Sequence, residues 1–192
     1  MNNIKIPFVD LYSQNKELRA EIDLAIADII DRSDFITGPT VEKFEKAISD
    51  YTGAEDCAGL GSGTNALVCA LKALGIGEGD RVMTVGHTFV STTEAIVNVG
   101  ARPVFIDIDQ YYHMDLEGIK EFNPECPPAA ILFVDLYGQT PDIDKLKKFA
   151  KKHKIKLIED AAQSFGSEYK GKKVGSLVDL TCFSFNPVKN LG

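Results

Sequence analysis

The sequence predicts an α/β fold in which a mainly parallel sheet lies between layers of helices. Short runs of β-branched and other apolar residues alternate with longer stretches in which apolar residues recur every three or four positions. This alternation is typical of strands that are joined by helices. Most of the strand-like runs are continuously apolar, as strands covered by helices on both faces must be. A chain of 192 residues can form one domain with a sizeable core,.

The expected helices are recognised by an apolar stripe on an otherwise polar surface. In the first of them Leu18, Ile22 and Ile26 are spaced four residues apart, with acidic and basic residues between them. Gly38 and Pro39 separate this helix from the next one, because both residues interrupt helices. The expected helices are Leu18–Asp31, Val41–Tyr51, Thr64–Leu74, Thr92–Val99 and Asp142–His153.

The expected strands lie between and after these helices. A hairpin is also expected late in the chain, where Ser167–Tyr169 and Lys173–Gly175 flank the glycine-containing turn Lys170–Lys172,. This hairpin would lead to the last strand without a crossover helix. The expected strands are Arg81–Val85, Pro103–Ile108, Ala129–Val134, Ile155–Glu159 and Leu180–Phe185.

The charge balance argues against nucleic acid or an anionic membrane as the main partner. The chain has 28 acidic and 21 basic residues, a formal net charge of -7 and a pI near 5.0, so it would repel polyanions. No apolar run approaches the roughly 18 to 20 residues that span a bilayer. The first residues lack the basic end and apolar stretch of a secretory signal,. We therefore expect a cytoplasmic protein that acts on small molecules or proteins.

The cysteines do not form a metal or disulfide motif. They are scattered, without a Cys-x-x-Cys pair and without clustered histidines, so neither a zinc site nor a disulfide framework is expected. We interpret them as reduced and mostly buried thiols. They are Cys57, Cys69, Cys126 and Cys182.

The first segment with chemical potential is the glycine-rich stretch before the third expected helix. Gly61, Gly63 and Thr64 lie where this helix begins. Glycines let the backbone approach a ligand, and free N–H groups at a helix start bind anions such as phosphate. Thr64 adds a hydroxyl donor and could also be the N-cap, and the alternative is an ordinary helix start without a ligand. The Gly-Lys-Ser/Thr ending of a P-loop is absent, so nucleoside triphosphate hydrolysis is not indicated.

The second segment is a pair of acidic residues, Glu159 and Asp160, at the end of an apolar strand. Open α/β sheets bind their ligands at the carboxyl ends of their strands. Neighbouring strand residues point to opposite faces, so only one of the two carboxylates can face the ligand. The small residues Ala161 and Ala162 beside Asp160 leave room for a flat ligand. The alternative is that a carboxylate only caps the following turn.

The third segment contains Lys189, which follows a buried strand and is flanked by Ser, Asn, Pro and Gly rather than by other charges. A lysine amine forms a Schiff base with a carbonyl, and desolvation favours its reactive neutral form. The alternative is a lysine exposed in a surface loop. A phosphate cradle, a carboxylate for a protonated pyridine nitrogen and a Schiff-base lysine together indicate pyridoxal 5'-phosphate (PLP), whose ring is an electron sink. Lys189 would then move the substrate proton as base and acid.

At these residues the sequence resembles the DegT/DnrJ/StrS family of PLP-dependent nucleotide-sugar aminotransferases. The resemblance covers essentially the whole chain, and it implies the large domain of the aspartate-aminotransferase-like fold (fold type I). The matching segments are Ile6–Leu11, Ile36–Pro39, Gly61–Leu67, Thr88–Val90, Pro103–Ile108, Leu136–Gln139, Glu159–Gln163, Phe183–Phe185 and Lys189–Gly192.

The resemblance implies roles for individual residues. Lys189 would be the Schiff-base lysine, Asp160 the partner of the pyridine nitrogen and Gln163 the neighbour of the ring hydroxyl. Phe89 would stack on the cofactor ring, a role that suits an aromatic side chain. Phosphate contacts are implied for Gly63, Thr64, Asn65 and Ser184. No metal site is expected.

The implied reaction transfers an amino group from an amino acid, typically glutamate, to a nucleotide-linked keto sugar through a ping-pong cycle. The resemblance also implies a role in polysaccharide biosynthesis and a homodimer with shared active sites. Family members are considerably longer, so residues 1–192 are expected to be the PLP-binding large domain, apparently truncated before the family's small C-terminal domain. A truncated, non-catalytic PLP-binding or regulatory relative is the alternative. Lys189 itself argues against the related dehydratases, which have His there.

The sequence departs from the family pattern at two places that we expect to bear on substrate choice. Asp135 stands where many relatives have His, and Gly86 and His87 precede Thr88 in place of a more common Pro-Asn pair. His87 could therefore face the site, although a single His is more often structural.

Overall fold

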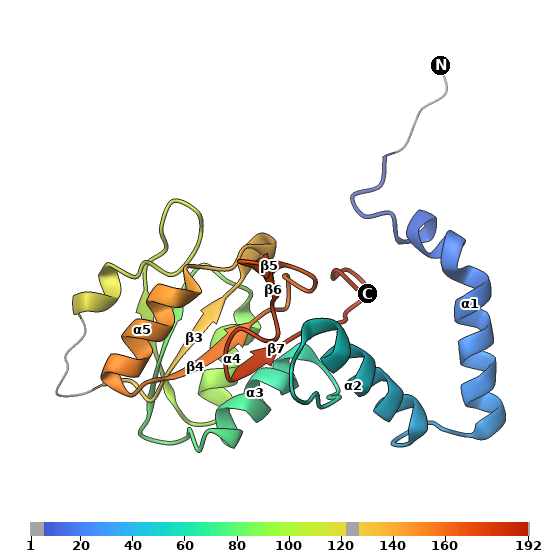
Figure 1. The fold of residues 1–192 in the computed structure, drawn as a ribbon, viewed down its shortest axis with the longest axis horizontal. Helices are drawn as coiled ribbons and strands as arrows, with labels where there is room; N and C mark the ends of the chain where they lie inside the picture. The colour runs from blue at the N-terminus through green and yellow to red at the C-terminus, as the bar shows by residue number, and fades with distance from the viewer. Residues whose placement is uncertain (1–5, 122–126, 192) are drawn as a thin grey trace.

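The computed structural model describes residues 6–121 and 127–191 and contains a five-stranded parallel sheet (Figure 1). The strand order is β2-β1-β3-β4-β7, and every neighbouring pair is parallel. The prediction of a mainly parallel sheet is confirmed. The strands are β1 (Arg81–Val85), β2 (Arg102–Ile106), β3 (Ala130–Val134), β4 (Lys156–Asp160) and β7 (Leu180–Cys182).

Helices cover both faces of the sheet because the chain crosses it in two directions. Helix α4 (Val90–Asn98) joins β1 to β2, and α5 (Ile143–His153) joins β3 to β4 in the opposite direction along the sheet. Right-handed crossovers place such helices on opposite faces. Helix α3 (Gly63–Ala73) packs beside α4. The strands are thus shielded on both sides, as their continuous apolar runs require.

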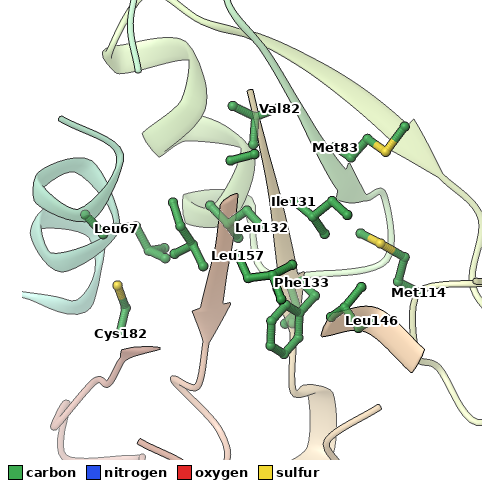
Figure 2. Close-up of a cluster of buried hydrophobic side chains, with 14 of the residues drawn as sticks. Leu67, Val82, Met83, Met114, Ile131, Leu132, Phe133, Leu146, Leu157 and Cys182 are labelled. Carbon is green, nitrogen blue, oxygen red and sulfur yellow. The ribbon is translucent and has the colours of Figure 1, made fainter. Parts of the chain in front are cut away.

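The hydrophobic core lies on both faces of the central strand β3, which is buried at all five positions. Figure 2 shows Phe133 of this strand near Leu146 of α5, while Leu67 of α3 and Cys182 of β7 lie on the other side. Met114, from the loop after β2, is 2% exposed and packs on the same side as Leu146 (Figure 2). This core holds the carboxyl ends of the strands in fixed positions, which is what a precise site needs.

Helix α1 (Leu11–Arg32) extends away from the sheet and has no buried residue (Figure 1). It begins earlier than predicted because the Asp10 side chain caps it, accepting a hydrogen bond from the Ser13 backbone N–H at 3.0 Å,. The predicted apolar stripe is present but exposed, with Leu18 at 48%. Helix α2 (Pro39–Thr52) leads from α1 back to the sheet.

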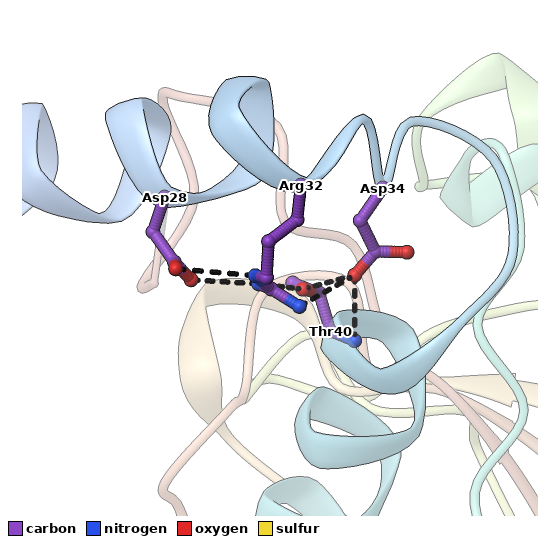
Figure 3. Close-up of polar contacts among 4 residues, drawn as sticks. All are labelled: Asp28, Arg32, Asp34 and Thr40. Atoms are coloured by element: carbon purple, nitrogen blue, oxygen red, sulfur yellow. Dashed lines mark hydrogen bonds and ion pairs between the residues drawn. The ribbon is translucent and has the colours of Figure 1, made fainter.

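The junction of α1 and α2 is held by a polar cluster (Figure 3). Arg32 lies 2.6 Å from Asp28 and 3.4 Å from Asp34. Asp34 also accepts hydrogen bonds from the Thr40 hydroxyl at 2.6 Å and the Thr40 backbone N–H at 3.2 Å. Asp34 therefore links the end of α1 to the first turn of α2, where it accepts from a backbone N–H group of the helix start,.

Several element boundaries near the site differ from the predictions, and the fourth strand, for example, ends at Asp160 rather than Glu159. The last strand ends at Cys182 rather than Phe185, because the chain turns there to bring Ser184 against the start of α3. The second strand ends at Ile106 rather than Ile108. The predicted hairpin is confirmed, with β5 (Glu168–Tyr169) antiparallel to β6 (Lys172–Lys173). Short 3-10 helices also occur, η1 (Gly118–Glu121) and η2 (Leu136–Gly138).

The cysteine prediction is only partly correct. Cys182 is buried, and burial raises its pKa to about 12, which makes it unreactive,. Cys57 is half-buried and Cys69 is exposed, so the expectation of mostly buried thiols is wrong for Cys69. All three are free thiols. Cys126 and Gly192 lie outside the described residues.

Candidate functional site

The predicted site residues gather at the carboxyl edge of the sheet. Phe89 follows β1, Asp160 is the last residue of β4, and Ser184 and Lys189 follow β7. The N-terminal end of α3 packs against the end of β7. Because the strands are parallel, segments far apart in the sequence meet at this one edge.

The start of α3 is a capped helix end that another segment of the chain approaches closely. Ser62, not Thr64, is its N-cap, and the Ser62 hydroxyl accepts a hydrogen bond from the Asn65 backbone N–H at 3.1 Å. The alternative that Thr64 is the cap is therefore wrong. A Cβ atom at Gly63 would lie 2.9 Å from the Ser184 Cβ atom. This position needs glycine because Ser184 approaches the helix end so closely.

Thr64 is half-buried and donates a hydrogen bond to the Ser91 hydroxyl at 2.9 Å. Ser91 lies in the first turn of α4, so the starts of two helices meet here. A phosphate group is typically bound by free N–H groups at helix starts, by hydroxyls, and by backbone that a glycine allows to come close to the ligand. Sequence reasoning missed Ser91, although this residue lies only two positions after Phe89. Asn65 is exposed beside this cluster.

Asp160 is 5% exposed and is held in place by donors from two elements. The Thr92 hydroxyl of α4 donates to one of its oxygens at 2.7 Å, and the Ala162 backbone N–H donates to the other at 3.2 Å. The Thr88 hydroxyl lies 2.8 Å from that of Thr92 and extends the network. Sequence reasoning missed both threonines, whose spacing of four places them on one side of the helix start.

The electrostatics of Asp160 suit a cationic ligand group. Burial raises its pKa, while the hydrogen bonds from Thr92 and Ala162 and the positive charge of Lys189 partly offset the rise. A protonated ring nitrogen against this carboxylate would supply the missing charge partner and favour the ionised form. The residues present therefore fit PLP, with Asp160 for the ring nitrogen and the α3 start for the phosphate.

Glu159 points to the opposite face of β4, as strand geometry predicts. It is completely buried, and the Thr181 hydroxyl donates to it at 2.7 Å. Beside it lies Asp135, also completely buried, which accepts a hydrogen bond from the Ser164 hydroxyl at 2.9 Å. The expectation that Asp135 bears on substrate choice is not supported, because its side chain is buried behind the strand that carries Asp160.

Asp135 and Glu159 form a pair of buried carboxyl groups. Their remaining oxygens, Asp135 Oδ1 and Glu159 Oε1, have no hydrogen-bond partner among the described residues. Burial and the charge of Glu159 raise the pKa of Asp135 well above its usual value, and burial raises that of Glu159. These raised pKa values favour a protonated carboxyl at this pair, which removes one buried charge.

Lys189 and Phe89 converge at the open side of the site. Lys189 is half-buried, and its Nζ atom lies 6.0 Å from the centre of the Phe89 ring. The Phe89 side chain is 65% exposed, so one ring face is available for stacking,. Gln163 is half-buried, and its Oε1 atom accepts a hydrogen bond from the Tyr137 backbone N–H at 3.0 Å. This bond orients the amide of Gln163.

A parallel sheet whose carboxyl edge carries an anion cradle, a buried carboxylate and a lysine beside an aromatic ring is the architecture of a PLP-dependent enzyme domain. Comparison with known proteins identifies the family. The chain belongs to the DegT/DnrJ/EryC1/StrS aminotransferase family, whose family model matches residues 16–192. The predicted family and its PLP cofactor are confirmed at this level.

Two curated relatives act on nucleotide sugars. The chain is 41% identical to the UDP-2-acetamido-2-deoxy-3-oxo-D-glucuronate aminotransferase of Pseudomonas aeruginosa, with 97% of this chain and 52% of the relative covered. It is 42% identical to the UDP-N-acetyl-3-dehydro-alpha-D-glucosamine 3-aminotransferase of Acidithiobacillus ferrooxidans, with 99% and 52% covered. The chain thus spans about half the length of the curated relatives it matches.

Solved structures show the same fold. The crystal structure of DesV from Streptomyces venezuelae superposes with a TM-score of 0.93 at 38% identity, covering 98% of this chain and 51% of that chain. The PLP form of the sugar aminotransferase Spr1654 from Streptococcus pneumoniae gives a TM-score of 0.80 at 32% identity, covering 86% and 47%. The predicted aminotransferase-like α/β fold is therefore confirmed.

Within residues 6–121 and 127–191, no helix is long and apolar enough to cross a membrane. The same part of the chain has no group of three or more His, Cys, Asp or Glu side chains placed to hold a metal ion.

Proposed function

We propose that the complete protein is a PLP-dependent aminotransferase that moves an amino group from an amino acid, most simply glutamate, to a nucleotide-linked keto sugar. In this proposal residues 1–192 form the PLP-binding large domain. The observation that carries it is the buried carboxylate of Asp160, which lies within the electrostatic reach of Lys189 at the carboxyl edge of the sheet. Family membership supports the same reaction class.

Each site residue has a task in this proposal. Gly63, Thr64, Asn65 and Ser184 would bind the phosphate of PLP, Phe89 would stack on its ring, and Gln163 would contact the ring hydroxyl. When bound, PLP supplies an electron sink for the carbanion that forms during amino transfer. Asp160 holds a positive charge at the ring nitrogen, and the Lys189 amine takes the proton from the substrate carbon and returns it.

We further propose that the amino group is transferred to carbon 3 of the sugar. The Pseudomonas and Acidithiobacillus relatives are named for 3-oxo and 3-dehydro sugars, and a Streptomyces venezuelae relative, 38% identical, is named a dTDP-3-amino-3,4,6-trideoxy-alpha-D-glucose transaminase. The product would be an amino-sugar precursor for polysaccharides. We place the enzyme in the cytoplasm as a homodimer with shared active sites, acting without nucleic acid or membrane partners.

The first experiment tests the cofactor and the lysine. Adding PLP to the complete apoprotein is expected to give the visible absorption band of lysine-bound PLP, and Lys189→Ala is expected to abolish it. Glutamate should then remove the band of the wild-type enzyme, and a UDP-3-keto sugar should restore it. Absence of the band refutes the cofactor assignment, whereas a band that glutamate does not change indicates a PLP-binding protein without transaminase activity.

The second experiment tests which carboxylate faces the cofactor. Asp160→Asn removes the charge next to the ring nitrogen, whereas Glu159→Gln changes a group on the opposite face. We expect a much larger loss of kcat for Asp160→Asn, by at least about a hundredfold, since charge stabilisation at a reacting group is worth several kcal/mol. Equal losses of kcat in the two variants would mean that Asp160 is not the carboxylate that contacts the cofactor.

A further inference from the structure

Three aromatic side chains outside the cofactor-binding residues form one exposed cluster, which we call the aromatic platform: His87, Tyr112 and Tyr137. The His87 and Tyr112 rings stack with centroids 5.5 Å apart, and the Tyr112 and Tyr137 rings meet edge to face at 5.4 Å. The Tyr137 hydroxyl lies 3.5 Å from Nε2 of His87. Tyr112 is 46% and Tyr137 61% exposed. The platform therefore presents ring faces and polar tips to solvent.

The platform occupies the part of the sheet edge that the cofactor residues leave open. His87 follows β1, Tyr112 lies in the loop after β2, and Tyr137 follows β3. From β1 the chain crosses to β2, and from β3 it crosses the other way to β4. The gap between β1 and β3 is thus a topological switch point, where open α/β sheets bind ligands.

The platform is continuous with the cofactor site through two links. The Tyr137 backbone N–H donates to Gln163, and His87 shares a short loop with Phe89, whose ring lies near the Lys189 amine. A ligand on the platform would therefore lie next to the Lys189 amine. In a nucleotide-linked sugar, the keto sugar is the part that must reach this amine.

The platform is held in place by backbone conformations that tyrosine rarely adopts. Tyr112 and Tyr137 have φ angles of 69° and 58°, in the left-handed region,. Asp109 supports the first of these, because its carbonyl accepts a hydrogen bond from the Tyr112 N–H at 3.1 Å. Its carboxylate also accepts one from the His113 N–H at 3.0 Å. Such conformations persist where surrounding structure enforces them, and they are concentrated at ligand sites.

The chemistry beside the platform favours a sugar over a diphosphate. His87 lines a hollow of about 530 Å³ together with Phe105 and Asp107, and no Lys or Arg of the described residues lines it. Its other lining residues are Gly86, Ile106 and Ile108. A carboxylate accepts hydrogen bonds from sugar hydroxyls but repels phosphates, and aromatic faces pack against the apolar face of a pyranose ring.

We propose that the aromatic platform binds the pyranose ring of the nucleotide sugar and holds it against the cofactor. This inference rests on the proposed function. The nucleotide would then be bound elsewhere, by residues that are not part of the platform. His87, Tyr112 and Tyr137 would act as specificity-determining residues for the sugar.

The test compares His87→Ala and Tyr112→Ala with Tyr111→Ala in the complete holoenzyme. Tyr111 is a matched control because its side chain is 57% exposed and its ring faces His113 rather than the platform. The measurements are the KM for UDP-N-acetyl-3-dehydro-α-D-glucosamine, the inhibition constant of free UDP, and the rate of the half-reaction with glutamate. We expect a roughly three- to tenfold rise in KM for both platform variants, as the loss of one aromatic contact predicts.

The inhibition constant of UDP and the rate of the glutamate half-reaction should change less than about twofold. This is smaller than the change expected from the loss of one aromatic contact. A parallel rise in the UDP constant would overturn the proposal, because the platform would then bind the nucleotide. KM values equal to that of Tyr111→Ala would overturn it as well. If the wild-type enzyme reacts with glutamate but aminates no nucleotide sugar, the proposed function fails and this inference fails with it; if only the variants behave like the control, the proposed function stands.

Discussion

Replacing Asp135 by Asn is expected to weaken the pH dependence of folding stability. Asp135 and Glu159 are both completely buried, and within the described part of the chain each has one oxygen without a hydrogen-bond partner. Burial raises the pKa of both groups, and the charge of Glu159 raises that of Asp135 further. In the unfolded chain both carboxyls ionise near pH 4. We therefore expect the folded protein to keep a proton on this pair at a pH where the unfolded chain has released it.

The sign and size of the effect follow from this proton. A carboxyl with a raised pKa stabilises the folded state fully below the unfolded pKa, and this stabilisation is lost as pH rises toward the folded pKa. One extra bound proton lowers the free energy of unfolding by about 1.4 kcal/mol for each pH unit in this window. Asn at position 135 carries no proton to release, and its amide can donate to Glu159 Oε1. In the variant, the free energy of unfolding should therefore fall less steeply with pH, by up to about 1.4 kcal/mol per pH unit.

Urea denaturation at several pH values from 5 to 8 measures this slope directly. Asp50→Asn is the matched control, since Asp50 is exposed and pairs with Lys46 on the helix surface. The control should keep the wild-type slope, and Asp135→Asn should become relatively more stable as pH rises. If Asp135→Asn has the same slope as the wild type, the pair does not keep a proton and the reasoning is refuted.

Two predictions concern glycines at which a Cβ atom would lie too close to a neighbouring side chain. Gly63→Ala should weaken PLP binding roughly tenfold in a titration of the apoprotein, because the new Cβ would lie 2.9 Å from Ser184 and push the phosphate cradle open. Gly175→Ala should destabilise the domain by about 3 kcal/mol in thermal unfolding, since Gly175 has a φ of 107° and a Cβ there would lie 2.8 Å from Thr52. Gly77→Ala is the control for both, because its nearest contact would be an ordinary 3.6 Å. Unchanged PLP affinity or unchanged melting temperature, respectively, would contradict these predictions.

Much of the fold was predictable because the relevant signals are local. The apolar runs and the spacing of apolar residues predicted every strand of the sheet and the late hairpin, with boundaries within a few residues. The start of α1 was missed because it depends on a cap, Asp10, rather than on an apolar stripe. The end of β7 was missed because Ser184 leaves the strand to reach Gly63, a contact between residues far apart in the sequence.

The sequence allowed the chemistry of the candidate site to be predicted, but not the neighbouring residues that hold its side chains in place. A lysine, a strand-end carboxylate and a glycine-rich helix start indicated the cofactor, because each residue type is suited to one part of PLP. Thr92 was not found, since nothing in the sequence indicates that α4 lies over the end of β4. Asp135 was assigned to the substrate side, although the structure buries it behind the strand next to Glu159.

The sequence by itself determined that this chain forms a parallel α/β sheet and carries the residues of a PLP site, because periodicity and residue chemistry are properties of short segments. It also determined that Glu159 and Asp160 face opposite ways. Only the tertiary structure decided that Asp160 lies near enough to Lys189 to feel its charge and that Glu159 is buried beside Asp135. The physical reason is that crossover direction decides which helix covers each face of β4, and contacts across the sheet, not neighbours along the chain, decide the surroundings of each carboxylate.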